Sequence, residues 1–162
     1  MNELLNDISN SLNIIDNAKI ISCHNDEYII IFTPYQFVLL LLVELNGRVY
    51  VKEDSEYWNF KFKSSSEDIS IKNPLNELYF IKKQILKQLS ELNMYFDDKY
   101  LSSFLVTNQK TIFDKKPINH IYSKDVPEKI KSIIVHNLNK KIIDSNSLDN
   151  LYKNYTIYLK LS

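Results

Sequence analysis

Seven consecutive apolar residues, Phe37 to Val43, form the strongest hydrophobic pattern in the chain, and they do not alternate with polar positions. A strand of this kind is covered on both faces, as at the centre of a sheet with helices on each side. Asn46-Gly47 follows, and then a second β-prone run, residues 48–51. Because a type I′ turn needs positive φ at both central residues, an Asn-Gly pair between two such runs predicts a hairpin. The pattern therefore predicts a central strand and a hairpin over residues 37–51.

Apolar periodicity predicts the other elements. Steps of three and four residues predict helices at residues 2–16, 73–92, 127–141 and 145–155. Apolar or alternating runs predict strands at residues 18–23, 28–33, 100–107 and 120–122, and an edge strand at 156–161. Asn73 is a suitable N-cap for the second helix, and Pro74 suits its first position. This helix would cross over the sheet, so that residues 100–107 lie parallel to a central strand.

The segment between the hairpin and the second helix, residues 52–68, is predicted to be a polar, mobile loop with Ser64-Ser65-Ser66 at its middle. Four aromatic residues interrupt it: Tyr57, Trp58, Phe60 and Phe62. Trp58 is expected to pack over a sheet edge and not to bind a ligand. Asn25-Asp26 is expected to form a turn between the first two strands.

Together these elements predict an α/β fold with a mixed central sheet flanked by helices. Its first part would be an antiparallel meander of four strands. A chain of 162 residues is long enough to bury roughly 70% of its unfolded surface as one domain, residues 1–162. Within this domain a core would span about residues 18–125, and a helical extension would span about residues 126–162.

Composition narrows the functional classes. Acidic and basic residues balance at 20 each, and Arg48 is the only arginine, which argues against a strongly electrostatic nucleic-acid binder but leaves a local patch open. Cys23 is the only cysteine, so no internal disulfide can form. The N-terminal residues lack signal-peptide features, and no apolar run reaches the roughly 20 residues of a membrane span. We expect a cytoplasmic protein without membrane contact, and the Lys, Asn and Ile content is typical of AT-rich bacterial or phage genomes.

Motifs for cofactor chemistry are scarce. His24, His120 and His136 have no metal-ligand spacing, and a single glycine, Gly47, excludes a glycine-rich phosphate loop. Paired acidic residues, such as Asp97-Asp98, stand at predicted turns, where solvated loop ends are the ordinary interpretation. We therefore expect no metal and no small-molecule cofactor.

The order of the motifs nevertheless resembles the nuclease-related domain (NERD) family of the PD-(D/E)xK, restriction-endonuclease-like superfamily. The resemblance covers roughly residues 18–125. The motifs that carry it are Thr33-Pro34, Gly47-Arg48-Val49-Tyr50, Trp58, Asn73-Pro74-Leu75 and Phe104-Leu105-Val106. It implies a restriction-endonuclease-like sheet and a Mg²⁺- or Mn²⁺-dependent nuclease site of carboxylates and a lysine.

The catalytic positions that this resemblance implies have changed. The family's Asp falls on Tyr28, its Glu on Leu41, its Lys on Val43 and its helical Gln on Glu77. Aromatic or apolar side chains at the first three positions predict a fold that has lost its catalytic set. A rebuilt site would have to combine Asp26, Glu27, Glu44 or Glu77 with Lys52, and would then need Mg²⁺ or Mn²⁺.

The favoured function is therefore a pseudo-nuclease domain that acts as a binding module. Neutral charge favours a protein partner or self-association over DNA, with exposed aromatic residues from Tyr57 to Phe62, Trp58 among them, as the contact. The alternative contact is nucleic acid, held by lysines without cleavage. The candidate lysines are Lys61, Lys63, Lys82, Lys83 and Lys87, although a solvated helix face explains the last three better. Two further alternatives are a nuclease with the rebuilt site and a small inhibitor or immunity-type interaction protein.

Overall fold

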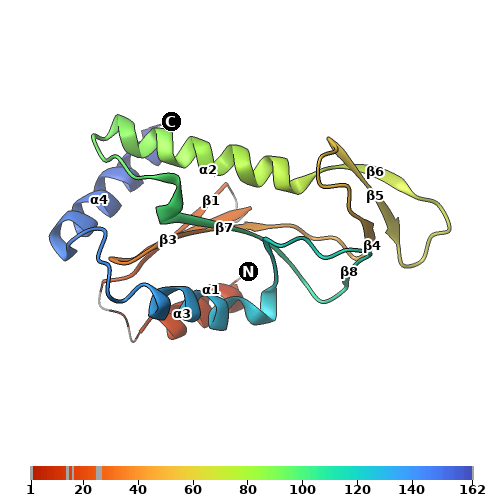
Figure 1. Cartoon of the computed structure of the whole chain (residues 1–162), viewed down its shortest axis with the longest axis horizontal. Helices are drawn as coiled ribbons and strands as arrows, with labels where there is room; N and C mark the ends of the chain where they lie inside the picture. Colours follow the sequence, from red (N-terminus) through yellow and green to blue (C-terminus); the bar gives the residue numbers. More distant parts are fainter. Residues whose placement is uncertain (1, 14, 16, 25–26, 162) are drawn as a thin grey trace.

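The apolar runs of the sequence build a five-stranded mixed sheet at the centre of the molecule (Figure 1). The computed structural model describes residues 2–13, 15, 17–24 and 27–161. The strands lie in the order β1–β2–β3–β7–β9. Their bounds are Lys19–Cys23 (β1), Tyr28–Phe32 (β2), Phe37–Leu42 (β3), Leu101–Thr107 (β7) and His120–Tyr122 (β9). β1, β2 and β3 are antiparallel, β7 is parallel to β3, and β9 is parallel to β7.

Helices cover both faces of this sheet (Figure 1). One core lies between the sheet and the helices α2 (Pro74–Glu91) and α4 (Ser145–Leu161). A second core lies between the opposite face and the helices α1 (Asn2–Leu12) and α3 (Val126–His136). Every residue of β2 is buried, and so is β3 apart from its last residue. The unbroken apolar runs are therefore explained by cover on both faces, as the sequence predicts.

The helix α2 begins where the sequence predicts. The side chain of Asn73 accepts a hydrogen bond of 2.9 Å from the backbone N–H of Leu75, and Pro74 occupies the first helical turn. The Asn73 amide also donates to the carbonyls of Glu53 and Ser55, at 3.2 and 2.9 Å. The same side chain thus caps the helix and holds the preceding loop. The parallel pairing of β7 with β3 across this helix is confirmed.

The predicted hairpin at Asn46-Gly47 is wrong. After β3 the chain leaves the central sheet, and β4 (Gly47–Tyr50) enters a second sheet of order β6–β5–β4–β8. The predicted four-stranded meander therefore holds for three strands only. Gly47 does not have a positive φ, so no type I′ turn forms there. Glycine is required for a different reason, because a Cβ at this position would lie 2.2 Å from the carbonyl oxygen of Lys61 on β5.

The expected polar loop over residues 52–68 is wrong as well, because it contains a strand of the second sheet, β5 (Tyr57–Phe62). Another strand, β6 (Ile69–Lys72), follows this segment and pairs antiparallel with β5. β8 (Thr111–Phe113) completes the sheet, parallel to β4. β5 alternates between exposed and buried positions, with Trp58 and Phe60 inside. The second sheet lies beyond the N-terminal end of α2 (Figure 1).

The terminal regions differ from the prediction in extent. Residues 156–161, expected as an edge strand, continue α4, because Leu148, Leu151 and Tyr155 are buried at helical spacing. α1 ends at Leu12 and α3 at His136, both earlier than predicted. Two short 3₁₀ helices, Asp98–Tyr100 and Ser123–Asp125, precede β7 and α3. The predicted Asn25-Asp26 turn and the predicted helix end at Asp16 lie outside the described residues. Among the helices that the structure describes, none has the length and apolarity to cross a membrane.

Candidate functional site

The three positions to which the resemblance assigns a catalytic Asp, Glu and Lys lie together in the core beneath α2. Tyr28 on β2 is the direct cross-strand partner of Leu41 on β3, and both are buried. Val43 packs against the same core, which includes Leu78 of α2. Glu77, by contrast, is exposed in the first turn of α2. The sheet thus brings the three positions together, and it fills them with apolar packing.

Neutral polar groups complete this part of the core. Cys23 on β1 pairs with Tyr28 across the strands, and their side chains are hydrogen bonded. Burial raises the pKa of the Cys23 thiol to about 11, and burial also raises the pKa of the Tyr28 hydroxyl. Both groups are therefore uncharged near neutral pH. This environment disfavours a carboxylate or a bound cation.

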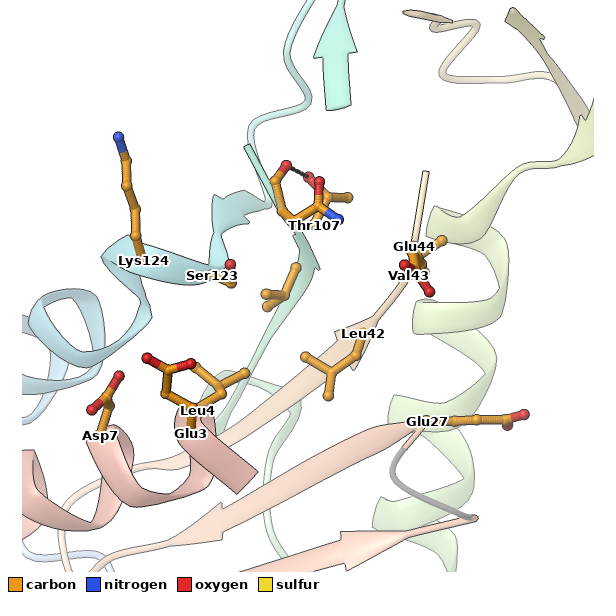
Figure 2. Close-up of a pocket in the computed structure, with 12 residues that line it drawn as sticks. Glu3, Leu4, Asp7, Glu27, Leu42, Val43, Glu44, Thr107, Ser123 and Lys124 are labelled. Atoms are coloured by element: carbon orange, nitrogen blue, oxygen red, sulfur yellow. Dashed lines mark hydrogen bonds between the residues drawn. The ribbon is translucent and has the colours of Figure 1, made fainter. Parts of the chain in front are cut away.

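A cavity of about 670 Å³ opens beside α1, at the ends of β3 and β7, and Val43 is among its lining residues (Figure 2). Four acidic side chains and one lysine are among its lining residues: Glu3, Asp7, Glu27, Glu44 and Lys124. Glu27 and Glu44, two of the acids considered for a rebuilt nuclease site, thus lie at one cavity. Figure 2 shows the carboxylate of Glu27 directed away from Glu3 and Asp7.

The other members of the rebuilt set are elsewhere. Lys52 and Glu77 do not line the acidic cavity, and Asp26 lies outside the described residues. Among the residues that are described, no three His, Cys, Asp or Glu side chains are grouped so that they could hold a metal ion. The predicted combination of these acids with Lys52 is therefore not assembled at this cavity.

The outer face of the second sheet carries basic residues, in contrast to the acidic cavity beside α1. Arg48 on β4 is the cross-strand partner of Lys61 on β5 and, on its other side, of Ile112 on β8. A groove of about 250 Å³ on this face is lined by Gly47, Arg48, Tyr50, Lys61, Phe62, Lys63, Lys110 and Ile112. Four of these eight residues are cationic, and none is acidic. We call Arg48, Lys61, Lys63 and Lys110 the basic groove.

Among the residues that the structure describes, the cations of the basic groove have no salt-bridge partner. Like charges directly opposite each other on neighbouring strands destabilise a sheet, and Arg48 and Lys61 are such a pair. Sheet stability therefore does not explain this arrangement. It produces a positive surface on a chain whose charges sum to zero.

Two of the other predicted lysines are neutralised locally. Lys82 and Lys83 each lie 2.9 Å from a carboxylate oxygen of Asp98. Hydrogen bonds from Lys82 and Lys83 lower the pKa of Asp98, which keeps that carboxylate charged. Lys87 is exposed on α2, outside the basic groove. Lys61 and Lys63 are thus brought together, whereas Lys82, Lys83 and Lys87 are not part of that set.

The predicted aromatic contact is divided between the two faces of β5. Trp58 is fully buried, and its indole N–H donates to the carbonyl of Lys52 at 3.0 Å. The expectation that Trp58 belongs to an exposed aromatic surface is therefore wrong. Tyr57 and Phe62 remain 45% and 48% exposed. Of these two, Tyr57 occupies the face that carries Lys61, because residues two and four positions apart on a strand share a face.

Sequence reasoning missed Arg48, Tyr50 and Lys110 as members of a site. The signal for the first two was the alternation in Gly47-Arg48-Val49-Tyr50, where Val49 is buried and Arg48 is exposed. Lys110 enters the groove only because β8 pairs with β4, and no local pattern indicates that pairing.

Comparison of the chain with family models, with curated proteins and with solved structures found no match.

Proposed function

We propose that this protein is a non-catalytic binding module built on a restriction-endonuclease-like, NERD-like sheet. The order of elements in the central sheet and its helices supports this layout: α1 and the antiparallel strands β1, β2 and β3 come first. After the strands β4, β5 and β6 of the second sheet come α2 and then β7, which is parallel to β3. The apolar environment of Tyr28, Leu41 and Val43 supports the loss of the catalytic set. Binding, and not cleavage, is then the function that remains.

The proposed ligand is nucleic acid, and the observation that carries the proposal is the basic groove. Arg48, Lys61, Lys63 and Lys110 converge there without a salt-bridged acid among the described residues. Phosphates supply most of the affinity of sequence-independent nucleic-acid binding, because cations that contact them release counterions. The arginine adds a planar donor that suits a phosphate. A neutral overall charge is compatible with this function, because acids gather elsewhere, as around the cavity beside α1.

Charge reversal tests the proposal. Fluorescence anisotropy would measure the affinity of the whole chain for labelled oligonucleotides. We expect Lys61→Glu with Lys63→Glu to lower that affinity at least about tenfold. The matched control is Lys131→Glu with Lys153→Glu, which makes the same charge change at exposed positions of α3 and α4. Equal losses in both double variants, or no binding by the unmodified protein, would refute the proposal.

A second candidate function is self-association through α2. Tyr79 and Phe80 are adjacent on this helix and are 63% and 67% exposed. Neighbouring exposed aromatic residues are enriched at protein interfaces. Sedimentation velocity over a concentration series tests this candidate. A dimer that Phe80→Ser abolishes would support it, and a monomer at all concentrations would exclude it.

A further inference from the structure

We propose that the outer face of the second sheet selects single-stranded nucleic acid, and that Tyr50 and Tyr57 stack against its bases. This inference rests on the proposed nucleic-acid function and adds the class of ligand. The observation behind it is that two tyrosines share the face of the basic groove. Tyr57 is 45% exposed, and Tyr50 is half-buried and lines the groove.

The strand register arranges this face in three rows across the sheet. The first row is Ile112, Arg48 and Lys61; the second is Tyr50, Asn59 and Ser70; the third is Tyr57 and Lys72. Successive rows are two residues apart along the strands, which is roughly 7 Å. The two tyrosines therefore lie between cations. Arg48 and Lys61 of the basic groove are in the row before Tyr50, and Lys72 is the cross-strand partner of Tyr57.

The two tyrosines are placed as separate stacking platforms. Tyr50 is opposite Asn59, and Tyr57 lies two residues before Asn59 on β5. Such diagonal neighbours are about 7–8 Å apart, which is more than the separation of two rings that stack on each other. Each ring can thus accept its own base. Stacking on aromatic side chains tolerates any sequence, because every base has a π face.

Polar side chains lie within the same rows. Asn59 and Ser70 are exposed between the tyrosines and the edge strand β6. An amide and a hydroxyl can both donate and accept hydrogen bonds, so they suit the edges of unpaired bases. None of the residues in the three rows is acidic.

Single strands match this surface better than duplexes do. In a duplex the bases are already stacked on one another, and their faces are closed to side chains. Exposed aromatic residues on a four-stranded sheet stack on splayed bases of single strands, with cations along the backbone. A surface that recognised phosphates alone would have no use for exposed tyrosines between its cations.

The test compares one labelled oligonucleotide of roughly 12 nucleotides as a single strand and as a duplex at equal salt. The whole chain is used, and anisotropy gives the affinities. We expect the single strand to bind at least about tenfold more tightly. Tyr57→Ala should weaken single-strand binding at least about fivefold, and Tyr57→Phe, which keeps the ring, should restore it. Tyr57→Leu keeps apolar bulk without a ring and replaces Tyr57→Ala if that variant unfolds.

The outcomes separate this inference from the proposed function. Equal affinity for both forms, with Tyr57→Ala and Tyr57→Leu neutral, would overturn the stacking inference while charge reversal at Lys61 and Lys63 still weakened binding. No binding of either form would overturn both. Tight single-strand binding that depends on the ring of Tyr57, with an unchanged salt dependence in Tyr57→Ala, is the result expected here.

Discussion

Tyr28 and Leu41 are direct partners on neighbouring strands, and both are buried beneath α2. The resemblance to nuclease-related domains places two catalytic carboxylates at these positions. Here the pair instead extends the hydrophobic core, and Cys23 hydrogen bonds to Tyr28 within it. Tyr28 and Leu41 thus contribute to the packing of this protein's core.

The first prediction concerns Leu41. Leu41→Glu would bury a carboxylate among apolar side chains, and we expect a loss of at least about 3 kcal/mol in the free energy of unfolding. Leu41→Met nearly conserves volume and should lose less than about 1.5 kcal/mol. Urea unfolding measures both. A Leu41→Glu protein as stable as the parent would show that the position is open to solvent or to a cation.

The second prediction concerns nuclease activity. We expect no cleavage of single- or double-stranded DNA or RNA with Mg²⁺ or Mn²⁺, because Glu27 and Glu44 lack the assembled partners of a rebuilt site in the described structure. Gel assays of the purified chain measure this. Cleavage that Glu44→Ala or Glu77→Ala abolishes would contradict the non-catalytic account, and cleavage that both variants retain would indicate a contaminating enzyme.

The third prediction concerns the only glycine. A Cβ at residue 47 would lie 2.2 Å from the Lys61 carbonyl oxygen and 3.1 Å from the ring of Phe60. β4 and β5 must then move apart, so we expect Gly47→Ala to destabilise the protein by about 1–3 kcal/mol. Ser64→Ala, at an exposed position of the β5–β6 loop, is the control and should be neutral. Thermal unfolding compares the two, and a neutral Gly47→Ala would contradict the close strand approach.

The fourth prediction concerns acid stability. The His120 ring is buried between Phe113 and Tyr122, and its Nε2 lies 2.7 Å from Thr107 Oγ1. Its Nδ1 has no hydrogen-bond partner among the described residues. Burial lowers its pKa from 6.5 to about 4, and the charge of Lys116 adds to this effect. The neutral form is therefore the one that the fold accommodates.

The sign of the pH dependence follows from this lowered pKa. Below pH 6.5 the His120 side chain of the unfolded chain is mostly protonated, whereas in the folded chain it stays mostly neutral down to about pH 4. The contribution of His120 should thus reduce stability by about 2 kcal/mol between pH 7 and pH 5. Urea unfolding at both values measures this loss. His120→Gln should remove most of it, and His136→Gln, at an exposed site, should retain it.

The central fold was predictable because its signals are local. Unbroken apolar runs identified β2 and β3, and Asn73-Pro74 identified the start of α2. The second sheet was not predicted, because Asn46-Gly47 has the composition of a hairpin turn. Its glycine instead permits a contact with Lys61, which is distant in sequence. The last predicted helix ended too early because residues 156–161 alternate between apolar and polar like a strand. In the structure they continue α4, and the burial of Leu151 and Tyr155 follows the helical period.

The candidate site was predictable only in part, because several of its residues are brought together by pairing between strands. Lys61 and Lys63 could be named as candidates from one segment of the sequence, but the shared face of Tyr57 and Lys61 depends on β5, which was predicted as a loop. Arg48, Tyr50 and Lys110 join them only through pairing between strands. Conversely, the sequence does not show that Asp98 neutralises Lys82 and Lys83. Asp98 lies 16 residues after Lys82 and 15 residues after Lys83, and it forms a salt bridge with each.

The salt dependence of nucleic-acid affinity tests the central claim most directly. If all four cations of the basic groove contact phosphates of a single strand, the logarithm of the association constant should fall with the logarithm of salt concentration with a slope of about −3. Lys61→Gln with Lys63→Gln should reduce the slope to about −1.5, and Lys131→Gln with Lys153→Gln should leave it unchanged. A slope near zero, or equal slopes in the parent protein and the Lys61→Gln, Lys63→Gln variant, would contradict binding at this face.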